Sequence, residues 1–309
     1  MKTLVLSCLA LLTTASSAIS ADKIRCLILT GDSDYSHPWQ PNVPFMRSML
    51  INTGRFDVRV EEEVRGITAA TLASYDVVVQ YYYGPRWGDA TEHAVEDFIR
   101  SGKGMIAVHG VTYGPFFGQA GGNPTEPKRR MDGEPWNAYI DMLGMNWKIE
   151  NIGHARRRTF PVKWVDREHP ISKGLPPTFI ADDELYHKID LKPNVHVLAT
   201  AYDDPIGGSA STSKDEPMVW TTPFGQGRVV VTTLGHDLLA MTQPGFIQLF
   251  TRGAEWAATG AVSPAPPGAP LGKGALLPDQ IRLADEQRGK RTNYENVLGV
   301  LMGVVASAW

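Results

Sequence analysis

Cysteine is scarce in this sequence, which contains only Cys8 and Cys26 among 309 residues. Cys8 falls in an N-terminal segment that we expect to be removed, so the remaining chain could form no intramolecular disulfide. A chain of this length can bury enough apolar surface to be stable without cross-links. Cys26 stands among apolar residues in a predicted buried strand, which favours a core role over that of a nucleophile.

Strong net charge is also missing. The 33 acidic residues nearly balance the 30 basic ones, and the formal charge of −3 gives no electrostatic reason to expect nucleic acid as a partner. The composition is 43% hydrophobic and 20% charged, which allows a sizeable core and argues against general disorder.

Apolar runs are shorter than the roughly 20 residues that a membrane-spanning helix needs. Residues 4–12 form one such run, preceded by Lys2 and followed by small residues between Ala15 and Ala21. This pattern is typical of a secretory signal and predicts cleavage after Ser20, with Ala18 and Ala21 as the alternative sites. We therefore expect residues 1–21 to be a signal peptide and the protein to be exported, periplasmic or secreted; a membrane anchor is the alternative.

The N-terminal half alternates predicted strands with predicted helices. The strands are residues 24–30, 56–60, 76–83 and 105–109, and the helices are residues 43–53, 69–74 and 91–101. Such alternation predicts βαβ units around a parallel sheet, and the continuous apolar strands fit a sheet covered on both faces. The predicted fold class is therefore α/β.

The C-terminal half is predicted to be mostly β. A helix at 135–143 precedes strands at 161–165, 196–201, 218–221 and 229–234, and a helix at 245–258 closes the domain. Residues 224–227 (FGQG) are typical of a hairpin turn. We expect one domain over residues 22–258.

Residues 259–309 begin as a Pro/Ala/Gly-rich linker and end in an apolar stretch, residues 297–309. We expect this tail to pack on the domain or on another subunit, which would make a homo-oligomer.

Polar or glycine-rich sequence follows three of the predicted strands, at Gly31-Asp32, Tyr83-Gly84 and His109-Gly110. Ligands of open α/β sheets bind outside the carboxyl ends of the strands. These residues therefore predict a ligand site at that edge.

Several of the eight histidines also follow strand ends or glycine-bearing turns. Imidazoles bind metals and move protons near neutral pH, and a carboxylate can act as an oxygen ligand or a general base. The predicted metal ligands, for a divalent zinc or manganese ion, are His109, His154, Glu184 and His236. Their spacing contains no HxH or HExxH motif, so hydrogen-bonded structural histidines are the alternative.

Loop aromatics and polar residues indicate a small-molecule carbohydrate as the ligand, because flat rings stack on sugars and carboxylates bind hydroxyls. The predicted substrate-binding residues are Asp32, His37, Trp39, Tyr83, Tyr113 and Trp136. The alternative is that about half of the loop aromatics are core residues.

The basic triplets at 128–130 and 156–158 are expected to be solvated, with binding of an anionic group as the alternative.

Seven short segments, in order, resemble the trehalose-utilisation (ThuA-like) family over roughly residues 22–258. They are YDVVV at 75–79, GMIAVH at 104–109, DELY at 183–186, HVLAT at 196–200, GQGRV at 225–229, LGHD at 234–237 and GAEWA at 253–257.

The resemblance implies a flavodoxin-like three-layer sandwich with a mostly parallel central sheet, related to the class I glutamine amidotransferases. It also implies a link to trehalose and 3-keto sugars. The residues that match the family's motif positions, and are the predicted catalytic residues, are His109, Asp183, Glu184, Tyr186 and His236. His154 matches less closely, because Ala155 replaces a flanking proline.

The amidotransferases carry a cysteine on a tight turn after a central strand, and here that turn contains His109 and no cysteine. Cysteine-dependent chemistry is therefore not expected. The leading hypothesis is metal-assisted acid–base chemistry (elimination, hydrolysis or isomerisation) on a glycoside or 3-keto-glycoside. A non-catalytic sugar-binding protein and a docking role through the tail are the alternatives.

Overall fold

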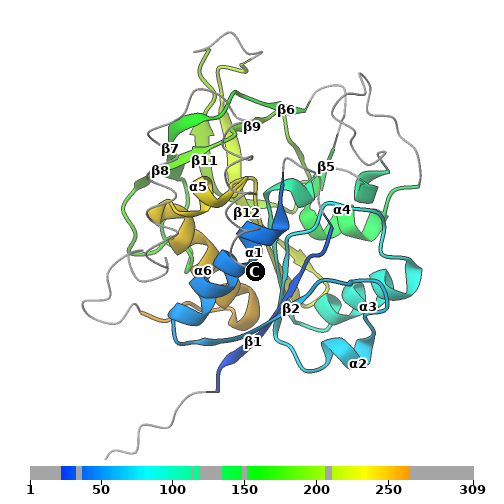
Figure 1. The fold of residues 1–309 in the computed structure, drawn as a ribbon. Helices are drawn as coiled ribbons and strands as arrows, with labels where there is room; N and C mark the ends of the chain where they lie inside the picture. The colour runs from blue at the N-terminus through cyan, green and yellow to red at the C-terminus, as the bar shows by residue number, and fades with distance from the viewer. Residues whose placement is uncertain are drawn as a thin grey trace, which may run out of the picture.

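A computed structural model describes residues 22–32, 37–112, 115–118, 134–147, 152–205 and 211–264 (Figure 1). The predicted signal peptide, Tyr113, the triplet at 128–130 and the tail beyond residue 264 lie outside these residues.

Four strands of the N-terminal half and one strand of the C-terminal half form the parallel part of one nine-stranded sheet. Their order is β2-β1-β3-β4-β13. The strands are β1 (Ile24–Leu29), β2 (Phe56–Glu61), β3 (Val77–Gln80), β4 (Gly104–Val108) and β13 (Gly227–Thr232). The Val, Ile and Leu runs of β1, β3, β4 and β13 are buried on both faces, as expected for a covered parallel sheet, whereas the edge strand β2 alternates buried and exposed residues. The predicted α/β alternation is confirmed.

The C-terminal half extends the same sheet with antiparallel strands. These are β12 (Asp215–Phe224), β11 (His196–Tyr202), β7 (Arg158–Trp164) and β8 (Thr178–Asp183), in that order outward from β13. Phe224 pairs with Gly227 across the β12–β13 turn, which confirms the predicted hairpin. The sheet is therefore mixed, with its parallel strands in the core of the fold.

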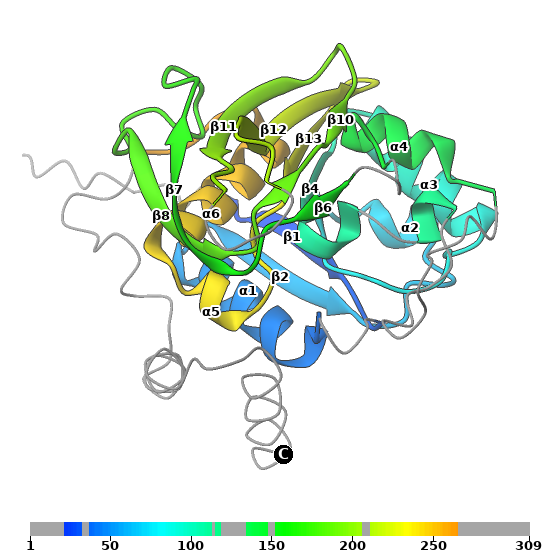
Figure 2. The same cartoon turned by 90° about the horizontal axis from the view of Figure 1, so that it is seen from above.

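Helices cover both faces and make three layers (Figures 1 and 2). One face carries α1 (Trp39–Asn52), α5 (Leu238–Met241) and α6 (Pro244–Thr259), and the other carries α2 (Ala69–Leu72), α3 (Asp89–Arg100) and α4 (Asn137–Leu143). Alternate residues of β1 serve the two cores: Cys26 and Ile28 face one, and Leu27 and Leu29 face the other. Burial raises the pKa of the Cys26 thiol, so this side chain behaves as the predicted core residue.

Short elements complete the edge where the parallel strands end. The chain leaves β4 through two 3₁₀ turns, η1 (His109–Thr112) and η2 (Pro115–Phe117). Two small antiparallel pairs lie apart from the main sheet: β6 (Gly153–His154) with β9 (Tyr186–His187), and β5 (Met145–Asn146) with β10 (Asp190–Leu191). Among the described helices, none combines the length and the hydropathy that a membrane crossing requires.

Candidate active site

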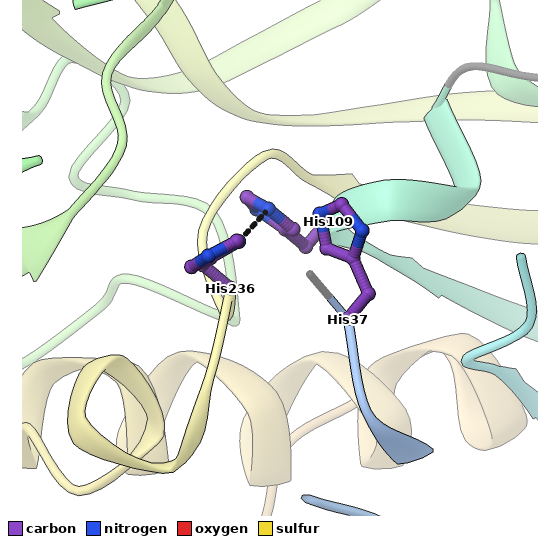
Figure 3. A group of neighbouring side chains, drawn as sticks. All are labelled: His37, His109 and His236. Carbon is purple, nitrogen blue, oxygen red and sulfur yellow. Dashed lines mark hydrogen bonds between the residues drawn. The ribbon is translucent and has the colours of Figure 1, made fainter. Parts of the chain in front are cut away.

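Three histidines meet at the carboxyl edge of the parallel strands (Figure 3). His37 precedes α1, His109 follows β4, and His236 lies between β13 and α5. Each offers a ring nitrogen, and these nitrogens all lie within 4.8 Å of one another. All three side chains are buried. Residues far apart in the sequence are thus brought together where the polar strand ends predicted a ligand site.

His109 stands in a strained backbone position. Its φ is +53°, in the left-handed region that residues other than glycine rarely adopt, and it turns the chain from β4 into η1. Its Nδ1–H donates to the Thr233 carbonyl at 2.6 Å, because a carbonyl oxygen can only accept. The lone pair therefore stays on Nε2, which faces His236.

His236 and His37 complete the cluster. The His236 Nδ1 lies 2.9 Å from the His109 Nε2, so in the neutral pair the His236 Nδ1–H donates to that lone pair. The centroid of the His37 ring lies 5.1 Å from the centroid of the His109 ring and 4.9 Å from that of the His236 ring. A side chain at Gly110 would approach the His37 ring to 3.3 Å, so glycine leaves room for this imidazole.

Glu184 is the carboxylate of the site. Its Oε2 lies 3.8 Å from the His109 Nε2 and 3.7 Å from the His236 Nδ1. Its Oε1 lies 3.6 Å from the Nδ1 of His154, whose side chain is about half exposed. Glu184 therefore separates the buried pair from a histidine at the surface.

Tyr186 reaches the same nitrogen from β9. Its hydroxyl lies 3.4 Å from the His109 Nε2, and its ring stacks on His154, its partner across the β6–β9 pair. Of the predicted catalytic residues, His109, Glu184, Tyr186 and His236 are therefore side by side.

Asp183, the fifth of them, bonds to backbone. One carboxylate oxygen accepts from the Glu184 N–H at 2.8 Å, and the other accepts from the Gly235 N–H at 2.6 Å. It thereby ties the turn that carries Glu184 to the turn that carries His236. This geometry makes Asp183 a positioning residue.

Arg157 adds a second tie between the same two turns. Its guanidinium forms a bidentate pair with Asp237, next to His236, and donates to the Asp182 carbonyl at 3.2 Å. Arg158 also pairs, with the Asp204 carboxylate at 2.5 Å. The expectation that the triplet at 156–158 is solvated is wrong for these two residues, because the buried Asp237 carboxylate pairs with Arg157 and the partly exposed Asp204 carboxylate pairs with Arg158.

Burial dominates the electrostatics of the cluster. It lowers the pKa of His109 and of His236 well below the ordinary value, and neighbouring histidines and Arg157 lower both further. Both imidazoles are therefore neutral at physiological pH. Burial raises the pKa of Asp183 to about 8, against the opposing effect of Arg157.

A small pocket adjoins the histidine cluster. It is lined by His37, three consecutive tyrosines after β3 and residues at the β4 turn: Tyr81, Tyr82, Tyr83, Val108, Gly110 and Val111. The ring centroids of Tyr83 and His37 are 5.7 Å apart. Of the predicted substrate-binding residues, His37 thus belongs to the histidine cluster and Tyr83 lies beside it.

The remaining predicted substrate-binding residues are more dispersed. Trp136 is buried in an aromatic cluster with Trp87, Phe116 and Tyr139, and its indole N–H donates to Glu96 at 2.7 Å. Trp39 packs against the core, whereas Asp32 is exposed. Tyr113 lies outside the described residues. The structure does not bring Trp136 to the histidines.

Sequence reasoning missed two supports of the site. Thr233 acts through its backbone carbonyl, which no side-chain pattern reveals. The sequence does not distinguish Arg157 from Arg156 and Arg158, which flank it in a basic triplet. A signal for the closeness of His37 does exist: like His109 and His236, it comes shortly after a strand of the parallel sheet.

The fold and the site define a flavodoxin-like α/β protein with a histidine–carboxylate cluster at the carboxyl edge of its parallel strands. The profile of the ThuA family, described as trehalose utilisation, matches residues 25–257, and the chain belongs to this family.

The solved structures that are similar to this chain include two ThuA-like proteins. A putative ThuA-like protein from Parabacteroides merdae is 26% identical, with a TM-score of 0.60 over 79% of this chain and 92% of that one. A putative ThuA-like protein from Bacteroides uniformis is 18% identical, with a TM-score of 0.60 over 81% of this chain and 98% of that one. A comparison with curated proteins gives no match.

Proposed function

We propose that this chain is an enzyme that removes the proton at C2 of a 3-keto-glycoside and eliminates the substituent at C1. The observation that carries the proposal is the Glu184 carboxylate, which lies 3.7–3.8 Å from two buried imidazoles at the ligand-binding edge of the sheet. Membership of a family described as trehalose utilisation supports a sugar as substrate.

The chemistry follows from the ketone. A carbonyl at C3 acidifies the hydrogen at C2, and Glu184 is the group placed to accept that proton as general base. The electron pair left at C2 then forms the C1–C2 double bond while the C1–O bond breaks. The leaving oxygen takes up a proton, and we assign its donation to the Tyr186 hydroxyl, which lies 3.4 Å from the His109 Nε2.

Negative charge develops on the C3 oxygen as the proton leaves C2. The imidazole cluster lies next to Glu184 and is the part of the site that can stabilise this charge. A divalent cation held there would stabilise it further. A pair of carboxylates of the kind that glycosidases use is not required for this route.

The cavity beside the cluster supports a small ligand. It is a small pocket whose wall contains consecutive tyrosines beside His37. Tyr83 and His37 give it an aromatic wall on which a sugar ring can pack.

The test is turnover of a panel of 3-keto-glycosides, with trehalose and glucose derivatives included. Reversible proton removal predicts that deuterium from heavy water enters C2 of recovered substrate, because C2 of the elimination product carries no hydrogen. Glu184→Gln should lower kcat by about 10²–10⁴-fold. Glu168→Gln, at an exposed surface carboxylate, is the matched control and should keep wild-type activity.

Absence of both turnover and C2 exchange across the panel would refute the proposal. Micromolar sugar binding by calorimetry in that case would favour the non-catalytic binding protein. Turnover that Glu184→Gln leaves unchanged would refute the role of the base.

A further inference from the structure

We propose that His37, His109 and His236 form a three-imidazole site for a divalent transition metal ion, with zinc as the best fit. The proposal deepens the proposed function by naming a cofactor, and its structural argument does not depend on the reaction.

The three nitrogens are already gathered from three separate segments of the chain. The pair formed by His109 and His236 is 2.9 Å apart, and the full set lies within 4.8 Å. Ligands of one tetrahedral zinc ion, with bonds of about 2.0–2.1 Å, are about 3.4 Å apart. The 2.9 Å pair would open by about 0.5 Å and the widest pair would close by at most about 1.4 Å to reach that spacing.

The surroundings of His109 are those of a metal ligand. Metal-binding histidines usually donate their second ring N–H to a carbonyl or carboxylate, which fixes the tautomer. The His109 Nδ1–H donates to the Thr233 carbonyl at 2.6 Å, so Nε2 presents its lone pair to the cluster. The strained φ of +53° at this residue is what directs the ring there.

The backbone next to His236 is fixed as well. The Asp183 carboxylate accepts from the preceding Gly235 N–H, and the Tyr81 hydroxyl donates to the His236 carbonyl at 3.3 Å. In the structure the His236 Nδ1–H donates to His109. An ion shared by these two nitrogens would require the His236 proton to move to Nε2, which is a spectroscopic signature of the site.

His37 thus replaces His154 in the ligand set expected from the sequence. The His154 side chain is about half exposed, and its Nδ1 faces the Glu184 oxygen that points away from the buried pair. Within the described residues, the three histidines form a group of potential ligands whose atoms all lie within 4.8 Å of one another, and His154 is not part of it. The Glu184 Oε2 also lies 3.7–3.8 Å from two of these nitrogens, and the proposal assigns this carboxylate to proton transfer instead of to the ion. Glu184 then remains available as the general base beside an open coordination position.

The donor set narrows the choice of ion. Imidazole suits zinc, cobalt, nickel and copper, whereas magnesium, calcium and manganese prefer oxygen ligands. Three buried imidazoles therefore favour zinc over manganese.

The experiment is a Co²⁺ titration of the full protein after dialysis against chelator, followed by visible absorption. We expect one Co²⁺ per chain, displaced by Zn²⁺, and a change of the His236 tautomer from Nδ1–H to Nε2–H in ¹⁵N-histidine NMR. His37→Ala should weaken Co²⁺ binding at least 100-fold, whereas His154→Ala should change it less than threefold.

His37→Gln serves as a second variant that keeps more of the side-chain volume, and circular dichroism checks that each variant is folded. Failure of the wild-type protein to bind Co²⁺ or Zn²⁺ would overturn the proposal. Equal losses in His37→Ala and His154→Ala would overturn it too.

The result is separable from the fate of the proposed function. Stoichiometric binding without sugar turnover would leave the metal site standing and remove the reaction. Turnover that survives complete metal removal would overturn the metal site as a cofactor site and leave the reaction standing.

Discussion

Asp183 makes folding stability depend on pH in an unusual direction. Burial raises the pKa of its carboxyl from the ordinary 3.8 to about 8 in the folded state. Below about pH 4 the carboxyl is protonated in both the folded and the unfolded chain. Between about pH 4 and pH 8 the unfolded chain releases this proton while the folded chain keeps it, so rising pH favours unfolding.

The expected size of this effect is large. Each pH unit in that window lowers the free energy of unfolding by about 1.4 kcal/mol, and the whole shift corresponds to roughly 6 kcal/mol. Above about pH 8 both states are ionised and the slope ends. Asp183→Asn removes the titration but leaves one of the two backbone N–H groups without an acceptor, at a pH-independent cost of about 1–3 kcal/mol.

The assay is urea unfolding of the wild type and Asp183→Asn at a series of pH values from 5 to 9. The stability advantage of the wild type over the variant should shrink by about 1.4 kcal/mol per pH unit up to about pH 8. Asp57→Asn, at an exposed position of β2, is the control and should track the wild type. A difference between the wild type and Asp183→Asn that stays flat over this range would refute the reasoning. It would mean that Arg157 and the two N–H donors outweigh burial.

Three further substitutions test the supports of the site. Gly235→Ala should cost at least about 2 kcal/mol in urea unfolding, because φ is +107° and the added Cβ would lie 2.8 Å from Phe246; an unchanged midpoint would contradict this. Arg157→Leu should lower the free energy of unfolding by about 4 kcal/mol, since it leaves the buried Asp237 carboxylate without its ion-pair partner. A melting temperature equal to that of the wild type would show that this ion pair does not stabilise the fold. His109→Gly should be about 1 kcal/mol more stable than His109→Ala, because a positive φ is unfavourable for alanine but not for glycine. Equal stabilities of the two variants would show that the backbone at this position is not strained.

Much of the fold could be predicted because local patterns coincide with burial. The Val77–Val79 run, the glycine after the α3 helix and the 224–227 turn each specify their element without help from distant residues. Boundaries moved where tertiary contacts decide them. The predicted strand at 76–83 ends at Gln80, because β4 and β1 pair with β3 only that far.

The site was harder to predict, since it depends on which strand ends become neighbours in space. His109 and His236 follow β4 and β13, which pair directly, so their closeness follows from the sheet order. His37 enters the cluster because β1 and β3 bring the start of α1 beside the same edge. Trp136 shows the converse error: this aromatic residue was expected to bind the substrate, yet its ring is buried in a core, which was the alternative for about half of these aromatics.

The position of His109 links the strain in the backbone to the chemistry. The left-handed φ of His109, directly after the central strand β4, holds its buried side chain at the sheet edge in a fixed direction, at a conformational cost of about 1–3 kcal/mol. Here that turn carries a neutral imidazole whose lone pair stays on Nε2. The Glu184 carboxylate lies 3.8 Å from this nitrogen. The proposed metal site and the proposed proton removal therefore both depend on the strained turn, because it fixes the direction of this lone pair.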